Sequence, residues 1–219
     1  PYHQMEKFYE RLSMVLNILG LLSFTSPFER KSNTQGLYGS CIVAVRSDYR
    51  KINGHSSVRS EIMDDLSLGK RFSESGIPVN NFLGTDQVSY RMYPGGLRSE
   101  IEGFGKSAVS GMKAMRHSTI CLVAMWVVGF VTIEILTPFV LILNHSLARW
   151  FLISYLIYTV QIFYFVKYTG NYKVFIPVFH GLSSLFMVYI MLYSHYRLKI
   201  VGSIPWKGRQ VHAGGGQNQ

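Results

Sequence analysis

The chain has 219 residues and a formal net charge of +10. Apolar residues make up 48% of it and are concentrated between Thr119 and Tyr193, so a uniformly soluble domain is excluded. Its two cysteines, Cys41 and Cys121, lie far apart and provide neither a disulfide framework nor a metal-binding motif.

Part of the positive charge lies just before the main apolar region, at Lys106, Lys113, Arg116 and His117. Nucleic-acid binding is one interpretation of a basic balance. Basic residues beside an apolar span are more typical of the cytoplasmic surface of a membrane. We therefore expect a membrane as a partner and no nucleic acid.

The first predicted helix covers residues 8–24, where apolar side chains recur at helical spacing. Its uninterrupted apolar part is too short to cross a membrane, which leaves an interfacial helix and a buried helix both open. Cys41–Val45 is a β-rich run that predicts a buried strand. Residues 47–51 indicate a short helix or turn, and Asn53-Gly54 is a strong turn signal.

A second helix is predicted from Asp64 to Ser75, with Gly76 as its left-handed stop. Residues 77–83 and 87–93 are each predicted as strands, the first at a sheet edge because Pro78 cannot donate a ladder hydrogen bond. Residues 97–116 predict an amphipathic helix that lies at a membrane surface.

Three apolar spans follow, at residues 119–143, 149–167 and 174–193, and each approaches the roughly 20 residues needed to cross hydrocarbon. The first contains Glu134 and Pro138, which predict a kink or break. A carboxylate inside a membrane is a functional candidate, but we favour a polar contact within the helix bundle or a break in the helix near the interface.

Asp64 and Asp65 begin the second predicted helix. Taken by pattern alone, two carboxylates at a helix start are caps or partners of the helix dipole. Adjacent helical residues do not share a face. The two are therefore not a paired acid and base, and at most one of them points into a cleft.

The chain nevertheless resembles the second half of a family 2 glycosyltransferase, the inverting class with the GT-A fold. The closest subgroup comprises bacterial membrane-bound enzymes that glycosylate carotenoid or hopanoid-type lipids, such as the diaponeurosporenoate glycosyltransferases. The resemblance covers nearly the whole chain, and residues 36–106 carry most of it. Its motifs are Tyr49 with Asn53-Gly54-His55, Asp64-Asp65 with Leu68-Gly69 and Arg71, Ser89 with Arg91-Met92-Tyr93, Glu102-Gly-Phe-Gly-Lys106, Pro1-Tyr-His3 and Trp206-Lys-Gly-Arg209.

The resemblance implies an α/β fold for residues 1–112, as the C-terminal, acceptor-side half of a GT-A domain with its interfacial helix. Residues 113–199 would then be an α-helical transmembrane region of about three spans, and residues 200–219 a basic, Gly-rich tail. The implied location is the cell membrane, with several crossings and the catalytic part in the cytoplasm.

In this family the second member of the acidic pair is the catalytic base, and Asp65 matches it. Asp64 stands where the family usually has Glu. The implied activity is hexosyl transfer from a nucleotide-sugar to a lipid-type acceptor, with Asp65 as general base.

Matched positions also provide candidate substrate-binding residues. For His55 a structural role is favoured on general grounds, and for Arg91 a solvated role is as plausible as contact with the leaving diphosphate. The candidates are His55, Arg91, Tyr93, Glu102 and Lys106.

The resemblance implies a divalent cation, Mg²⁺ or Mn²⁺, as cofactor. The family holds this ion through an upstream Asp-x-Asp motif, which does not occur among these residues, so no metal ligand is predicted here. Because the chain starts at Pro1, we expect it to lack the family's N-terminal half. The alternatives are a noncatalytic membrane-anchored remnant or anchoring subunit, and a small transporter that uses Glu134.

Overall fold

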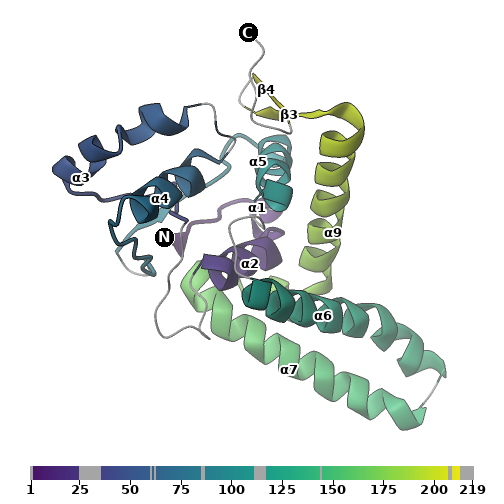
Figure 1. Cartoon of the computed structure of the whole chain (residues 1–219). Helices are drawn as coiled ribbons and strands as arrows, with labels where there is room; N and C mark the ends of the chain where they lie inside the picture. Colours follow the sequence, from purple (N-terminus) through teal and green to yellow (C-terminus); the bar gives the residue numbers. More distant parts are fainter. Residues whose placement is uncertain are drawn as a thin grey trace.

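The computed structural model is mostly helical (Figure 1). The short helices α3 and α4 lie on one side of the molecule, and α6 and α7 form a long antiparallel hairpin on the other. The structure describes residues 2–24, 36–59, 61, 63–84, 87–110, 117–143, 145–206 and 209–212.

The predicted helix at residues 8–24 is divided into α1 (Phe8–Arg11) and α2 (Met14–Phe24). The backbone groups exposed by this break bond to one distant side chain. The Ser183 hydroxyl donates to the Leu12 carbonyl at 2.6 Å and accepts from the Val15 N–H at 2.9 Å. Sequence periodicity could not reveal the break, because its partner lies about 170 residues away.

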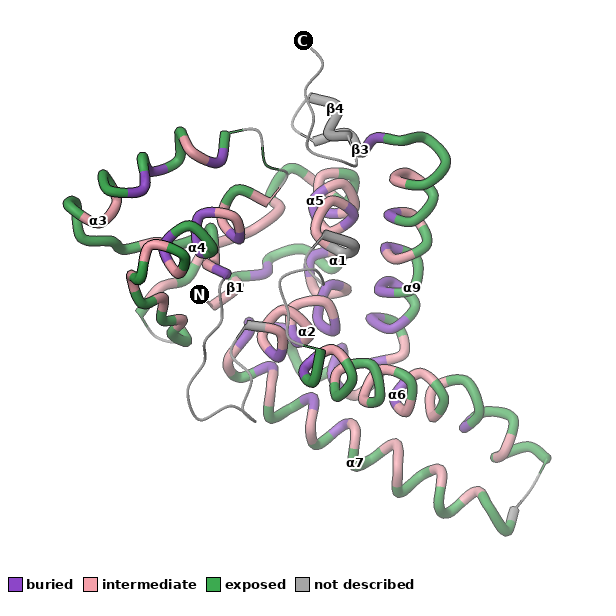
Figure 2. The backbone as a smooth tube through the Cα atoms, viewed as in Figure 1, coloured by how far each residue is buried: buried purple, intermediate pink, exposed green. Residues whose placement is uncertain are grey.

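Helix α2 lies among α6 (His117–Leu143), α7 (His145–Thr169) and α9 (Gly181–Tyr196). Its residues Met14, Val15 and Ile18 are fully buried. Figure 2 shows this concentration of buried residues where the helices meet. Of the two interpretations left open for this segment, the buried helix is therefore the one observed.

A smaller cluster of apolar side chains joins α3 (Arg46–Lys51), η1 (Gly54–Val58) and α4 (Asp64–Glu74). Both turn signals here are confirmed. Asn53 adopts a left-handed conformation with φ 58°, and Gly76 follows α4 with φ 74°. The buried members of the cluster are Ile52, Val58, Leu68 and Phe72.

The predicted strands are largely wrong. Residues 42–45 have no regular structure, and Val43 is 93% exposed. Residues 77–83 form no strand either. At their start, the Ile77 N–H donates to the Phe72 carbonyl near the end of α4 instead of to a neighbouring strand. A short apolar run does not specify a pairing partner, and the described residues place no strand beside either run.

Within residues 87–93 only β2 (Ser89–Tyr90) is a strand, and it pairs in parallel with β1 (Tyr2–His3). The other sheet among the described residues is the antiparallel hairpin of β3 (Ser203–Trp206) and β4 (Arg209–His212). The described residues are thus mostly helical with very little sheet. The α/β character expected of residues 1–112 is not evident among them.

Helix α5 (Leu97–Ser110) confirms the start of the predicted amphipathic helix. The remainder of that prediction, with Lys113 and Arg116, lies outside the described residues. Helix α5 packs along α9, and the Ser194 hydroxyl donates to the Gly105 carbonyl at 2.6 Å.

Helices α6 and α7 are long and apolar enough to cross a membrane. The most apolar part of α6 has a mean hydropathy of 2.3, yet only 11% of that window is buried within the protein. Most of its apolar surface therefore needs a covering other than this chain. Pro138 lies inside α6 and does not interrupt it.

The third predicted span is wrong as one continuous helix. It consists of α8 (Phe175–Val178) and the 16-residue α9, which together flank a break at Phe179 and His180. After α9 the chain continues in a π-helical turn, η3 (Arg197–Val201), into β3.

The break turns the buried His180 toward Glu134 of α6. Its Nδ1 contacts the Glu134 carboxylate, and its Nε2 lies 3.1 Å from the Thr159 hydroxyl of α7. The polar contact predicted for Glu134 within the helix bundle is confirmed.

Candidate active site

Asp65 lies in the first turn of α4 and is partly buried, whereas its neighbour Asp64 is exposed. The Asp65 Oδ1 atom accepts the Leu66 N–H at 2.9 Å. Its Oδ2 atom accepts the Gly39 N–H at 3.1 Å, which connects α4 to the preceding loop. The two carboxylates thus have different surroundings, as expected for adjacent helical residues.

Burial raises the pKa of Asp65, and the negative charge of Asp64 adds to the increase. The two N–H donors and the charge of Lys106 oppose the shift without cancelling it. A carboxylate with a raised pKa holds a proton more tightly and is a better proton acceptor than an ordinary aspartate. Lys106, on α5, was predicted to bind substrate. In the structure its positive charge acts on the Asp65 carboxylate.

Tyr90 is a neighbour of Asp65 that sequence reasoning missed. Burial raises the pKa of its phenol, and the charge of Asp65 contributes to the increase. Tyr90 lies within a motif that carried the resemblance, but nothing in that motif distinguished it from Ser89 or Arg91. Only the pairing of β2 with β1 places it here.

A largely apolar cavity of about 520 Å³ lies between this region and the helical hairpin. Tyr38, Ser40 and Tyr90 line it on the side of Asp65. Asp65 does not itself line the cavity. Its carboxylate holds the N–H of Gly39, the residue between Tyr38 and Ser40, and so lies directly behind the wall.

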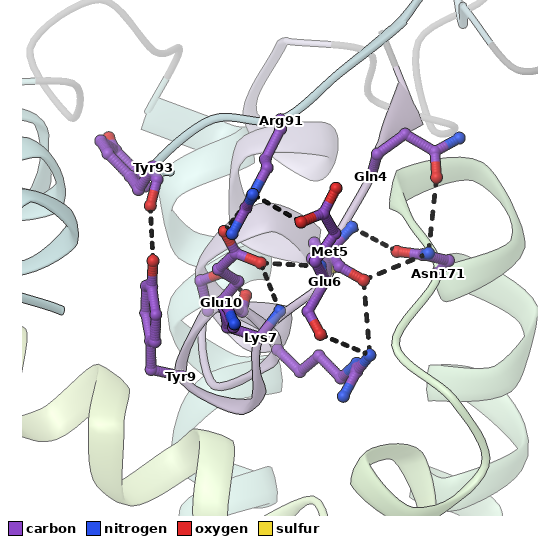
Figure 3. Close-up of polar contacts among 11 residues, drawn as sticks. Gln4, Met5, Glu6, Lys7, Tyr9, Glu10, Arg91, Tyr93 and Asn171 are labelled. Atoms are coloured by element: carbon purple, nitrogen blue, oxygen red, sulfur yellow. Dashed lines mark hydrogen bonds and ion pairs between the residues drawn. The ribbon is translucent and has the colours of Figure 1, made fainter. Parts of the chain in front are cut away.

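Arg91 is engaged elsewhere (Figure 3). Its guanidinium lies 2.6 Å from the buried carboxylate of Glu10 and 2.6 Å from Glu6. Burial alone would raise the pKa of Glu10, but the N–H groups of Lys7 and Glu6, together with Arg91, lower it overall. Arg91 therefore joins β2 to the N-terminal segment.

Tyr93 and Glu102 also have partners within the chain. The Tyr93 ring packs against Phe104 and covers Gly103, where an added Cβ would collide with it. Burial raises the pKa of its phenol well above the usual range. Glu102 pairs with Arg98 one helical turn away at 2.9 Å.

His55 is exposed and belongs to a separate contact. Its Nδ1 lies 2.7 Å from the Tyr49 hydroxyl, which also accepts the His55 N–H at 3.0 Å. Among the described contacts, none joins this pair to Asp65 or to the cavity. Of the predicted site residues, the structure brings Asp64, Asp65 and Lys106 together.

Glu100 is a second residue that sequence reasoning missed. It is 1% exposed, and neither carboxylate oxygen has a hydrogen-bond partner among the described residues. Burial raises its pKa to about 8, and the charge of Glu10 adds to the shift. In sequence, Glu100 is indistinguishable from any other acidic residue in the first turn of a helix.

The residues present do not fit a metal centre. Within the described ranges, no three His, Cys, Asp or Glu side chains are grouped as ligands. Both oxygens of Asp65 already accept backbone N–H groups. We assign no metal ligand in this part of the chain.

Comparison with known proteins relates the chain to bacterial glycosyltransferases. It is 27% identical over 213 residues to the 4,4′-diaponeurosporenoate glycosyltransferases of Staphylococcus aureus strains USA300 and NCTC 8325. The alignment covers 96% of this chain and 56% of each relative, so the chain spans about half the length of the curated relatives it matches. No family model and no solved structure matches it.

Proposed function

We propose that these residues form the acceptor-side part of a membrane-bound inverting glycosyltransferase of family 2, with residues 1–112 belonging to a GT-A domain. The complete protein would move a sugar from a nucleotide-sugar to a lipid-type acceptor. The observation that carries the proposal is the similarity to carotenoid glycosyltransferases over 96% of the chain.

Asp65 is the proposed general base. The acceptor hydroxyl or carboxyl gives its proton to the Asp65 carboxylate while the acceptor oxygen attacks the anomeric carbon. The bond from that carbon to the diphosphate breaks, and the nucleoside diphosphate leaves with the electron pair. One displacement inverts the anomeric centre. The raised pKa of Asp65 supports this role.

A divalent cation, Mg²⁺ or Mn²⁺, remains an expectation from the resemblance; when bound, it would neutralise the diphosphate charge. Lys106 is the proposed cationic neighbour of the reacting groups, because its charge already acts on Asp65. Helices α6 and α7 are proposed to cross the cell membrane, and the catalytic part to lie on its cytoplasmic side.

The test is Asp65→Asn in the full-length protein, with Asp64→Asn as the matched control. We expect Asp65→Asn to lower transfer of radiolabelled sugar into extracted lipid by at least about 100-fold, which is the usual contribution of a general base. Asp64→Asn should stay within a few-fold of wild type, because Asp64 is exposed.

Both variants should insert into membranes at the wild-type level. Undiminished transfer by Asp65→Asn would reject its assignment as the base. A wild-type protein that transfers no sugar would instead favour a noncatalytic anchoring role.

A further inference from the structure

The cavity beside Asp65 is much larger than proton transfer requires. At about 520 Å³ it falls within the range of small-molecule binding sites. Its walls come from parts of the chain that are distant in sequence. Helix α2 contributes Leu16 and Gly20, α6 contributes Val123 and Val127, and α9 contributes Met187.

The cavity differs chemically from one side to the other. Near Asp65 its lining carries the hydroxyl groups of Ser40 and Tyr90. On the other side it reaches Val128, which is 65% exposed on the outer surface of α6. Val128 therefore belongs both to the cavity lining and to the exposed apolar surface of α6.

We infer that this cavity binds the hydrocarbon chain of the acceptor and holds its polar end at Ser40 and Tyr90, on the side of the cavity behind which Asp65 lies. This inference rests on the proposed function and names the chemistry of the acceptor, an amphiphile with a long apolar chain and a terminal hydroxyl or carboxyl. A mostly apolar wall that includes residues of α6 suits such a chain, because few polar groups would need to be desolvated along its path.

Gly20 offers a way to fill the cavity. It lines the cavity from within α2, and a Cβ atom added there would meet nothing within 4 Å. Leu and Ala are both better helix formers than Gly, so neither substitution should disturb α2. Gly20→Leu occupies the cavity, and Gly20→Ala adds only a methyl group and serves as the matched control.

The first measurement compares kcat/KM for a long-chain acceptor with that for a short-chain acceptor bearing the same reactive group. Gly20→Leu should lower the long-chain value by about tenfold or more, the scale on which a filled apolar pocket rejects a substrate. The loss should be smaller for the short-chain acceptor than for the long-chain one, and smaller for Gly20→Ala than for Gly20→Leu. Ala124→Phe, on the α6 side of the cavity, should reproduce the selective loss. Unchanged long-chain transfer in both bulky variants would overturn the inference.

The second measurement does not depend on activity. A diazirine-bearing fatty acid is photolysed with each protein in bilayers, and the labelled peptides are identified. Labelling of α2 at its cavity residues should occur in wild type and be lost in Gly20→Leu. Labelling confined to the outer faces of α6 and α7 would overturn the inference. Loss of cavity labelling with intact long-chain transfer would also overturn it, since the bound chain would then be a membrane lipid rather than the acceptor.

Discussion

At the residue scale, Glu100 is the carboxyl group with the most unfavourable surroundings described. It is buried without a hydrogen-bond partner, and its pKa is raised from 4.5 to about 8. The folded protein therefore favours the protonated acid, since an isolated buried carboxylate is costly. The stability that the neutral acid provides is complete below pH 4.5 and is lost as the pH rises toward 8.

Glu100→Gln should remove this pH dependence, because the amide is neutral throughout. Near pH 8 the variant should be more stable than wild type by on the order of 4 kcal/mol at most. Near pH 5 the two should be similar. Urea unfolding at both pH values tests this. Glu102→Gln is the control and should change stability by less than about 1 kcal/mol, because its ion pair with Arg98 lies at the surface. A stability difference that does not vary with pH would contradict the prediction.

Asp65 gives a second pH prediction. As the proposed base, Asp65 would act in its ionised form, and burial raises its pKa above that of an ordinary aspartate. The acid limb of kcat/KM should therefore fall at a pH clearly above about 3.9. Asp64→Asn should move this limb toward lower pH, because the charge of Asp64 contributes to the shift. A limb at the ordinary value, or one unmoved in Asp64→Asn, would argue against Asp65 as the titrating base.

How far single residues could be predicted from sequence depended on where their partners lie. The start of α4 and the exposure difference between Asp64 and Asp65 follow from local rules of helix geometry. The ion pairs of Arg91 join residues more than 80 positions apart, so no local pattern indicates them. The sequence left Arg91 open between a solvated role and contact with the leaving diphosphate, whereas the structure gives it two carboxylate partners.

At the scale of elements, the two strands of the β1–β2 sheet are only two residues each and depend on other contacts. Arg91, the residue after β2, forms ion pairs with Glu6 and Glu10 (Figure 3). The Asn171 carboxamide oxygen accepts the Met5 N–H at 2.6 Å. The N-terminal segment, residues 2–10, is thus attached to Asn171 through Met5 and to Arg91 through Glu6 and Glu10.

Arg91→Met should detach this segment, because the buried Glu10 carboxylate loses its charged partner. The melting temperature should fall by more than about 5 °C. Arg98→Met removes a guanidinium that is 90% exposed and should change the melting temperature little. Differential scanning calorimetry compares the two. Equal, small effects would mean that Arg91 is free for a substrate role.

Helices and strands differed in how well the sequence predicted them. Helices α4 and α5 repeat their apolar residues at helical spacing, and α6 and α7 are long apolar runs. The sequence therefore predicts all four. Strands 41–45 and 77–83 were inferred from apolar content alone, and whether such runs pair depends on neighbours that a sequence does not display. The break at Phe179 escaped prediction because the partners of His180, Glu134 and Thr159, lie on other helices.

At the scale of the whole molecule, the Glu134–His180–Thr159 contact joins α6, α7 and the α8–α9 junction. Glu134→Leu should destabilise the detergent-solubilised protein by about 1–2 kcal/mol, the range of polar contacts between membrane helices. Glu134→Gln keeps an acceptor for His180 and should cost less. A double-mutant cycle with His180→Phe should show that the two losses are not additive. Additive losses would mean that the two side chains act independently.

The hydroxyl of Ser183, which bonds to the backbone at the break between α1 and α2, also has a consequence for folding during synthesis. Val15 and Ser183 are separated by 168 positions, so helix α2 is synthesised well before the residue that bonds to its first turn. Until α9 is synthesised, the apolar side chains of α2 are not fully buried. The nascent chain must be kept from aggregating during that interval, and removal of α9 should expose α2 to proteases.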